Sequence, residues 1–174
     1  MRARILLLTT GGTIASLPTA EGLAPGLDGE ELARMLPQGI LEHYDVTVRD
    51  ILHLDSSNIQ PEEWQTIARH VFDNRTEYDG IVITHGTDTM AYTASVLSFM
   101  LRGIAIPVVL TGAQLPMAHP LSDGMENLRT ALAMAASGAA GVFLAFDRKV
   151  MLGCRAVKIR TTDFDAFDSV NWPL

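Results

Sequence analysis

The sequence predicts an α/β fold in which an open, mainly parallel β-sheet carries helices on both of its faces. Apolar segments rich in Val, Ile and Leu alternate along the chain with segments of helical periodicity, which is typical of parallel strands joined by crossover helices. The first of these segments has no alternation of polar and apolar residues, as expected for a strand buried on both faces. The 174 residues match one domain, because a domain usually has about 150 residues.

Five strands are expected in this sheet. The first, residues 4–9, contains four consecutive Ile or Leu residues and is followed by a Gly-Gly pair. The other four are expected at residues 46–52, 81–84, 108–111 and 141–146. Residues 16–27 are rich in Gly and Pro and are expected to form a loop. Residues after the last strand show no clear pattern.

Four helices are expected between the strands. The clearest begins at Pro61, because proline is favoured in the first helical turn. Its predicted apolar stripe consists of Trp64, Ile67, Ala68, Val71 and Phe72. A short helix over residues 30–36 should end at Pro37, and another helix is expected near residues 89–101. The last helix should run from about 123 to 136, where Asp123 and Glu126 have the spacing of a capping box.

Composition and charge favour a globular protein that binds a small molecule. Hydrophobic residues form 48% of the sequence, which excludes a disordered or collagen-like chain. The formal net charge is -7 and no run of Lys or Arg occurs, which argues against a nucleic-acid partner. No apolar segment has the length and continuity of a signal peptide or a membrane span. We therefore expect a soluble, cytoplasmic protein that binds neither nucleic acid nor membranes.

The chain contains one cysteine, Cys154, which cannot form an internal disulfide bond. No Cys and His residues have the spacing of a familiar metal site, so no metal is expected. We expect Cys154 to be a buried core residue.

Hydroxyl-bearing and glycine residues follow four of the predicted strands. Ligands of open parallel sheets bind beyond the carboxyl ends of the strands, so these four loops are expected to meet at one edge. The loops are residues 9–13 (TTGGT), 55–58 (DSSN), 84–89 (THGTDT) and 111–114 (TGAQ). For any single loop, an ordinary turn or helix cap is the simpler interpretation; four such loops together favour a site. None has a GxGxxG, GxxxxGK[ST] or GxSxG motif, which disfavours nucleotide binding and this type of serine hydrolase.

A hydroxyl nucleophile needs a partner that accepts its proton. Asp88 follows Thr87 directly and could hold a lysine. Lys158 is a candidate, because Val157 and Ile159 flank it and would partly shield its amine from water. The alternative is that Lys158 is a surface residue of an edge strand. A histidine in a turn such as that of His85 is more often a hydrogen-bonding scaffold than a base.

Two of the four loops together resemble the signature motifs of the bacterial-type L-asparaginases (the asparaginase/glutaminase family). These motifs are TGGTIA at residues 10–15 and HGTDTM at residues 85–90. The similarity extends over essentially the whole chain and includes residues 55–57, 110–113 and the segment around Lys158. It implies a Rossmann-like, three-layer fold for residues 1–174, which would be the family's large N-terminal catalytic domain.

The resemblance also implies the reaction and the residues that perform it. The side-chain amide of L-asparagine would be hydrolysed to L-aspartate and ammonia through a threonine acyl-enzyme, without metal or cofactor. Thr13 matches the nucleophile, whereas Thr87, Asp88 and Lys158 match a second catalytic group in which the lysine and the aspartate polarise a threonine hydroxyl. The residues implied to bind substrate are Ser56, Ser57, Gly86 and Ala113. Among them, Ser56 would hold the α-carboxylate and Ala113 would offer a backbone contact to the amide; Asp88 would also meet the α-amine.

The sequence departs from the family pattern in two respects. Many members carry a tyrosine after TGGTIA that orients the nucleophile, yet residues 16–27 contain none, and Leu23 lies near that position. Family members also continue into a smaller C-terminal domain, which this sequence does not include. An acidic residue from that domain of a neighbouring subunit completes the active site, so the resemblance implies a homodimer or homotetramer for the full-length form.

Two other functions remain open from the sequence. One is the glutamine-hydrolysing subunit of a tRNA-dependent amidotransferase, although that subunit usually carries an extra N-terminal domain and here the TGGT loop follows the first strand directly. The other is an amino-acid-binding module without turnover. The preference for asparagine over glutamine cannot be predicted, because one methylene group contributes only about 1–3 kcal/mol to discrimination in a pocket.

Overall fold

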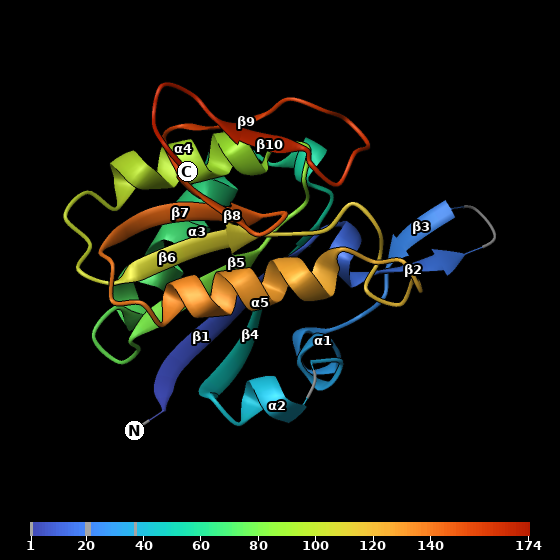
Figure 1. Ribbon diagram of the computed structural model, residues 1–174, viewed down its shortest axis with the longest axis horizontal. Helices are drawn as coiled ribbons and strands as arrows, with labels where there is room; N and C mark the ends of the chain where they lie inside the picture. The colour runs from blue at the N-terminus through green and yellow to red at the C-terminus, as the bar shows by residue number, and fades with distance from the viewer. Residues whose placement is uncertain (1, 20–21, 37) are drawn as a thin grey trace.

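The computed structural model describes residues 2–19, 22–36 and 38–174. Six strands form one sheet in the order β4-β1-β5-β6-β7-β8 (Figure 1). The first five are parallel, and β8 pairs with β7 in the antiparallel direction. Their bounds are Ala3–Gly11 (β1), Tyr44–Leu54 (β4), Gly80–Thr84 (β5), Pro107–Thr111 (β6), Gly141–Phe146 (β7) and Lys149–Leu152 (β8). The five predicted strands and the mainly parallel sheet are thereby confirmed.

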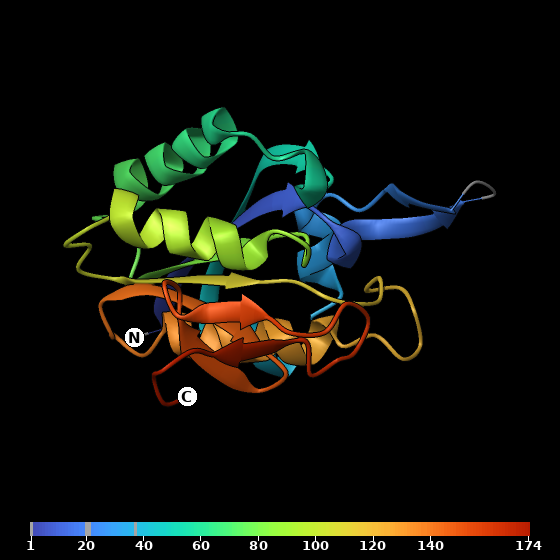
Figure 2. The same cartoon turned by 90° about the horizontal axis from the view of Figure 1, so that it is seen from above.

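Helices cover both faces of this sheet, as predicted. Helices α3 (Pro61–Asn74) and α4 (Met90–Met100) lie on one face, and α1 (Gly29–Arg34) and α5 (Gly124–Ala135) lie on the other (Figure 2). A short helix, α2 (Gln38–Leu41), follows α1; Pro37, expected to end the first helix, lies outside the described residues. Within the described part of the chain, no helix has the length and apolar character needed to cross a membrane.

The surroundings of the inner strand β1 explain why polar and apolar residues do not alternate in its sequence. Leu6 and Leu8 belong to the hydrophobic core under α3 and α4, whereas Ile5 and Leu7 belong to the core under α1 and α5. All four side chains are completely buried. Successive side chains of a strand point to opposite faces, so a strand between two helical layers needs apolar residues at every position.

Besides β8, two segments form strands that the sequence did not predict. Part of the predicted loop 16–27 is an antiparallel hairpin of β2 (Ser16–Thr19) and β3 (Gly22–Pro25), which projects from the body of the protein (Figures 1 and 2). The side chain of Leu23 lies outside the described residues. Near the C-terminus, β9 (Ala156–Lys158) pairs with β10 (Phe167–Ser169). The Phe167 ring packs against Phe146, with 4.9 Å between ring centroids, and this contact holds the pair on the main sheet.

Three side chains lie elsewhere than the sequence predicts. Phe72 is 53% exposed, because one step beyond Val71 turns it about 100° away from the buried stripe of α3. Cys154, expected in the core, is exposed because it lies in the turn between β8 and β9. Asp123 precedes α5 but makes no side-chain cap; its carboxylate instead accepts hydrogen bonds from the backbone N–H groups of Gln114 and Leu115.

The strand order determines where a ligand can bind. With the parallel strands numbered in chain order, the sheet reads 2-1-3-4-5, so the chain continues from β1 to one side and later returns to the other. In open parallel sheets, the carboxyl ends of the strands at such a switch point form a crevice that binds ligands. Here that point lies between β1 and β5.

Candidate functional site

The loops after β1 and β5 are joined where the two strands end. Thr9 of β1 is in register with Thr84 of β5, and Thr84 is in register with Thr111 of β6. The hydroxyl of Thr10 donates a hydrogen bond of 2.8 Å to the carbonyl oxygen of Thr84. Register and hydrogen bond together place the TGGTIA and HGTDTM segments side by side at the switch point.

Two glycines allow these loops to touch through their backbones. A Cβ atom on Gly12 would lie 2.5 Å from the backbone nitrogen of Gly86, and Gly12 has a φ of +84°. A Cβ atom on Gly86 would in turn lie 2.5 Å from the Ser56 hydroxyl oxygen. Real Cβ atoms are excluded at such distances, so only glycine permits the loops after β1, β5 and β4 to meet.

A cavity of about 220 Å³ opens where the three loops meet. Its lining residues are Gly12, Thr13, Ser16, Leu54, Asp55, Ser56, Gly86, Thr87 and Asp88. Thr13 begins the short 3-10 helix Thr13–Ala15, whereas Thr87 lies between β5 and α4. Two threonines separated by more than seventy positions therefore face one cavity, which is small enough to favour a small ligand.

The loop after β4 brings Ser56 to the cavity and directs Ser57 elsewhere. Asp55 accepts hydrogen bonds of 2.9 Å from both the backbone N–H and the hydroxyl of Ser57, which is exposed and does not line the cavity. The backbone carbonyl of Ser56 accepts a 2.8 Å hydrogen bond from the Thr89 hydroxyl. Thr89 thus ties the loop after β4 to the start of α4 and fixes Ser56 at the cavity wall.

Lys158 of β9 contacts both residues of the predicted second catalytic group. Its ammonium nitrogen donates hydrogen bonds to the Thr87 hydroxyl at 2.9 Å and to the Asp88 carboxylate at 2.8 Å. The Lys158 side chain is 15% exposed, so the alternative of an ordinary surface lysine does not describe it. This geometry lets a cation polarise the Thr87 hydroxyl while Asp88 orients the cation.

Gln114 is a polar neighbour of Thr87 that the sequence analysis did not single out. The Thr87 hydroxyl lies 3.3 Å from the side-chain oxygen of Gln114. The sequence could have indicated Gln114 as a site residue, because it ends the TGAQ loop after β6, one position beyond Ala113. Ala113 itself is 1% exposed, and its methyl group packs in the core under α5. Its predicted backbone contact to substrate stays a prediction.

His85 is a scaffold, in agreement with the preferred interpretation of its position. Its ring is buried, and Nδ1 lies 2.8 Å from the carbonyl oxygen of Gly86. Burial lowers the pKa of His85 to about 4, although the hydrogen bond to Gly86 acts in the opposite direction. The imidazole is therefore neutral at pH 7 and holds the peptide that leads into Thr87.

Comparisons with known proteins found a matching family and similar proteins over nearly the whole chain. Residues 4–174 match the family described as "Asparaginase, N-terminal". The L-asparaginase of Thermococcus kodakarensis is 50% identical over 170 residues, which cover 98% of this chain and 52% of that protein. A solved structure titled "The thermostable L-asparaginase from Thermococcus kodakarensis" has a TM-score of 0.90 and 51% identity, covering 98% of this chain and 52% of that one.

A second kind of relative is also similar. A glutamyl-tRNA(Gln) amidotransferase subunit of Thermoplasma acidophilum is 38% identical over 179 aligned positions, covering 98% of this chain and 43% of that protein. The chain spans about half the length of the L-asparaginase that it matches, and less of the amidotransferase subunit.

Proposed function

This chain belongs to the asparaginase family, and on that premise we propose that it carries the catalytic site of an amidohydrolase that converts L-asparagine to L-aspartate and ammonia. One observation carries the proposal most directly. Thr13 comes from one loop and Thr87 and Asp88 from another, and all three line one small cavity. Lys158 of β9 contacts both Thr87 and Asp88. A nucleophile and a polarised second hydroxyl at one site are what amide cleavage through an acyl-enzyme requires.

The cavity offers groups of the right kind for a small zwitterion. The carboxylate of Asp88 would meet the substrate's α-ammonium group, and the hydroxyl of Ser56 would bind its α-carboxylate. Both residues line the cavity, and Gly86, two residues before Asp88, lets its loop approach Ser56 closely. Ser57 and Ala113, which the family resemblance also implies, are proposed to contribute through backbone or rim contacts.

In the proposed reaction, Thr13 is the first nucleophile. Its hydroxyl oxygen attacks the side-chain amide carbon of asparagine, and the backbone N–H of Thr87 is a candidate donor to the resulting oxyanion. The C–N bond then breaks, the nitrogen leaves with an added proton as ammonia, and an ester with Thr13 remains. Water cleaves this ester to give aspartate and the free hydroxyl. Lys158 and Asp88 polarise the Thr87 hydroxyl, which acts as the second group in the proton transfers.

Release of ammonia provides the test of this function. The chain would be assayed with L-asparagine and with L-glutamine, first alone and then with the C-terminal half of the Thermococcus kodakarensis L-asparaginase added in trans. We expect asparagine to be the better substrate and the added half to raise the rate. Preferred turnover of glutamine would instead support an amidotransferase subunit, the function named for the relative that is 38% identical. Tight binding of L-aspartate with no turnover in either format would support a binding module.

The setting of this activity is part of the same proposal. We place residues 1–174 in one N-terminal catalytic domain, because the family match covers residues 4–174 and the six-stranded sheet takes its strands from Ala3 to Leu152. For the full-length form we propose a cytoplasmic homodimer or homotetramer whose partner is the small substrate. The net charge of -7 disfavours nucleic acid as a further partner. Light scattering on a full-length protein that contains this chain tests the oligomeric state.

A further inference from the structure

Gln114 is held in place through its backbone before its side chain reaches the site. Its N–H group donates to both carboxylate oxygens of Asp123 at 3.0 Å, and Asn127 of α5 donates to the same carboxylate at 3.0 Å. The Asn127 amide also donates to the carbonyl of Gly112 at 3.0 Å. Gln114 therefore leaves the end of β6 in a direction that α5 determines.

The contacts of the Gln114 side chain fix which end of the amide faces which neighbour. Its Nε2 atom lies 3.2 Å from the carbonyl oxygen of Thr161 and 2.8 Å from that of Asp163. Carbonyl oxygens only accept hydrogen bonds, so the NH₂ group must face them. The amide oxygen must then face Thr87.

This orientation determines the direction of the Thr87 hydroxyl. An amide oxygen accepts and cannot donate, so the Thr87 proton points to Gln114. A lone pair of the Thr87 oxygen is then left for the ammonium group of Lys158, which donates to it at 2.9 Å. Gln114 and Lys158 thus hold opposite sides of one hydroxyl.

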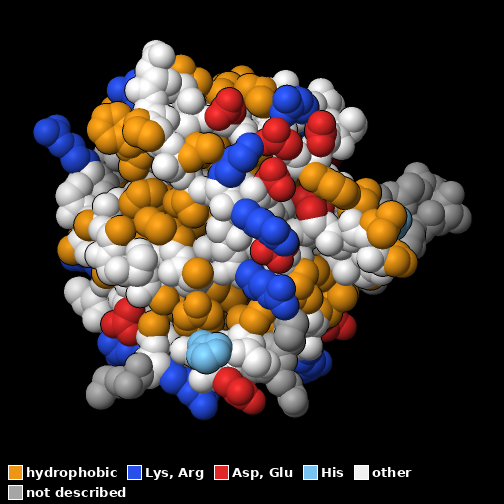
Figure 3. Space-filling model, in the orientation of Figure 1, with side chains coloured by type: hydrophobic (Ala, Val, Ile, Leu, Met, Phe, Trp, Pro, Cys, Tyr) orange, Lys and Arg blue, Asp and Glu red, His pale blue; other side chains and the backbone are white. Residues whose placement is uncertain are grey.

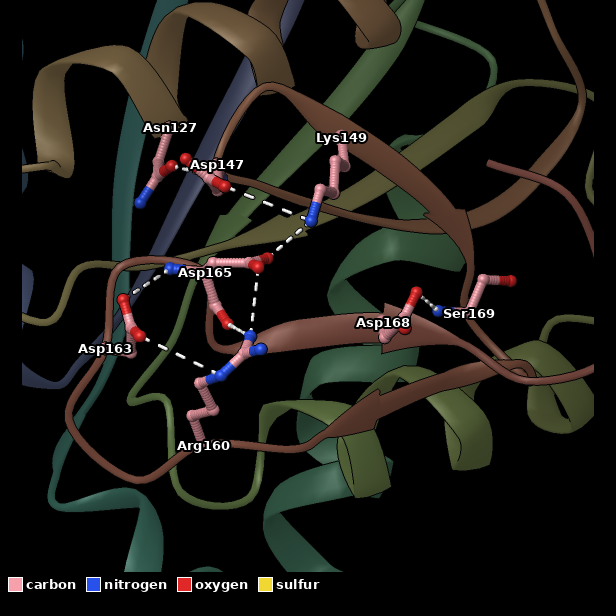
Figure 4. A network of polar contacts seen from close by, with 8 residues as sticks. All are labelled: Asn127, Asp147, Lys149, Arg160, Asp163, Asp165, Asp168 and Ser169. Carbon is pink, nitrogen blue, oxygen red and sulfur yellow. Dashed lines mark hydrogen bonds and ion pairs between the residues drawn. The ribbon is translucent and has the colours of Figure 1, made fainter.

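The two carbonyls that hold Gln114 belong to the segment 159–166, which begins directly after Lys158. Figure 4 shows Lys149 of β8 and Arg160 both pointing toward Asp165 within this segment. Lys149 makes an ion pair with Asp165, and Arg160 donates to Asp165 at 2.9 Å and lies 3.8 Å from Asp163. Acidic and basic side chains are correspondingly interleaved on the face seen in Figure 3.

The ion pairs of this segment persist at neutral pH. The hydrogen bond from Lys149 lowers the pKa of the Asp165 carboxyl below its ordinary value, and the same contact raises the pKa of Lys149. Both groups therefore carry their charges over a wide range around pH 7. Lys158 directly precedes the segment that docks Gln114, so the conformation of this segment affects both partners of Thr87.

We propose that Gln114 is a positioning residue of the catalytic site. Its amide oxygen accepts a hydrogen bond from the Thr87 hydroxyl, and this bond couples the orientation of that hydroxyl to the segment 159–166. The inference rests on the proposed amidohydrolase function. Gln114 takes no proton itself, because an amide oxygen is a poor base. Its role is to hold the Thr87 oxygen with a free lone pair toward Lys158, ready for the proton transfers of the reaction.

Two substitutions test this role in whichever format of the ammonia assay shows turnover. Gln114→Met keeps the approximate volume but neither accepts from Thr87 nor donates to the segment, so kcat should fall roughly 10- to 100-fold with KM little changed. Gln114→Glu should be impaired at pH 8, because its carboxylate repels the carbonyls of Thr161 and Asp163. When protonated, the same side chain regains a C=O acceptor for Thr87 and one O–H donor, which can serve one of the two carbonyls that the amide NH₂ group contacts. Its rate relative to wild type should therefore rise at least tenfold between pH 8 and pH 5.

Gln65→Glu is the matched control, because Gln65 is exposed on α3 and the same charge is added away from the site. Its rate relative to wild type should not change with pH. A Gln114→Glu profile as flat as this control, or a Gln114→Met variant with the kcat of wild type, would overturn the proposal. Circular dichroism and thermal unfolding establish that each variant is folded.

A measurement without turnover separates this proposal from the function on which it rests. In ¹H–¹⁵N spectra of the wild-type chain, the two side-chain NH₂ protons of Gln114 should be shifted downfield by their carbonyl partners. Arg160→Gln, which removes the ion pairs of Arg160 with Asp163 and Asp165, should move them toward the positions of a free amide. Free-amide positions in wild type would overturn the Gln114 proposal even if asparagine is hydrolysed. Downfield positions without hydrolysis in any format would instead count against the function.

Discussion

The Thr93 hydroxyl donates a hydrogen bond to Nε2 of His85 across 2.9 Å. The direction follows from the neighbours, because the carbonyl of Gly86 only accepts and Nδ1 must carry the ring proton. With the imidazole neutral, Nε2 is an acceptor. The indole N–H of Trp64 then donates to the Thr93 oxygen at 2.9 Å. A continuous chain of donors therefore runs from α3 through α4 to the peptide before Thr87.

Thr93→Val should destabilise the protein by about 2 kcal/mol. The substitution keeps the shape of the side chain but leaves Nε2 of His85 and the indole N–H of Trp64 without a partner, and unpaired buried groups carry a penalty of this order. Urea denaturation measures the change. Thr66→Val on α3 is the control, because Thr66 donates only to the carbonyl of its own helix, and its effect should stay within about 0.5 kcal/mol. Equal effects of the two substitutions would contradict the relay.

The buried imidazole of His85 should make the folded state weaker in acid. In the unfolded chain this histidine binds a proton near its ordinary pKa of 6.5, but in the folded state burial lowers the pKa to about 4. Between these values the unfolded state binds more protons, so the free energy of unfolding falls as the pH falls through this window. His85 therefore lowers the free energy of unfolding by about 3 kcal/mol in total as the pH falls from 6.5 to 4. Above pH 6.5 it causes no loss, and below pH 4 the loss does not grow further.

The measurement is a series of urea titrations from pH 7.5 to pH 4 for wild type and for His85→Gln. The variant starts from a lower stability but lacks this titration, so its pH dependence should be shallower by about the same 3 kcal/mol. The ¹³C-resolved ring signal of His85 in wild type should remain constant from pH 7.5 to pH 5. A midpoint near pH 6.5 would show that the ring is not held neutral.

Gly86→Ala should damage both stability and function. The new Cβ atom would lie 2.5 Å from the Ser56 hydroxyl oxygen and 2.7 Å from its Cβ, so a loop must move at a cost of about 1–3 kcal/mol. Adding Ser56→Gly removes both atoms and should restore most of the stability but not aspartate binding. Thermal unfolding and calorimetric titration with L-aspartate separate these effects. Gly39→Ala, where the added atom meets nothing within 4 Å, is the control.

Thr13→Val should lower the rate of ammonia release from asparagine by at least about 10³-fold, because the proposed nucleophile is removed while the shape of the side chain is kept. Binding of L-aspartate should change much less. Thr47→Val, at an exposed position of β4 away from the cavity, should leave the rate unchanged. A Thr13→Val variant that retains wild-type turnover would leave Thr87 as the nucleophile.

The parallel sheet could be predicted because its inner strands β1, β5, β6 and β7 are buried on both faces. Ile5 to Leu8 form an unbroken apolar run, which in a chain of this size is typical of a central strand covered on both sides. The same rule cannot identify β2, β3, β9 and β10, because these short strands lie outside the main sheet and carry mixed sequences. Asp123 shows a second limit: its spacing to Glu126 fits a capping box, yet tertiary contacts with Gln114 and Leu115 claim its carboxylate.

The site was predictable where local sequence and strand topology agree. Thr13, Ser56, Gly86, Thr87 and Asp88 each follow a strand, so the rule that loops meet beyond the carboxyl ends places them together. Gln114 follows a strand as well, but its role depends on carbonyls of the segment 159–166. Every residue has a backbone carbonyl, so the sequence does not indicate which carbonyls accept hydrogen bonds from the Gln114 side chain.

The backbone contact between Gly12 and Gly86 limits how specificity can evolve in this protein. A Cβ atom on Gly12 would lie 2.5 Å from the backbone nitrogen of Gly86, so no side chain can be added there unless one of the loops moves. Mutations that change which ligand fits are therefore expected at other lining positions, such as Ser16, Leu54 and Asp55. Selection can change the ligand through these positions while the backbone contact between Gly12 and Gly86 is kept.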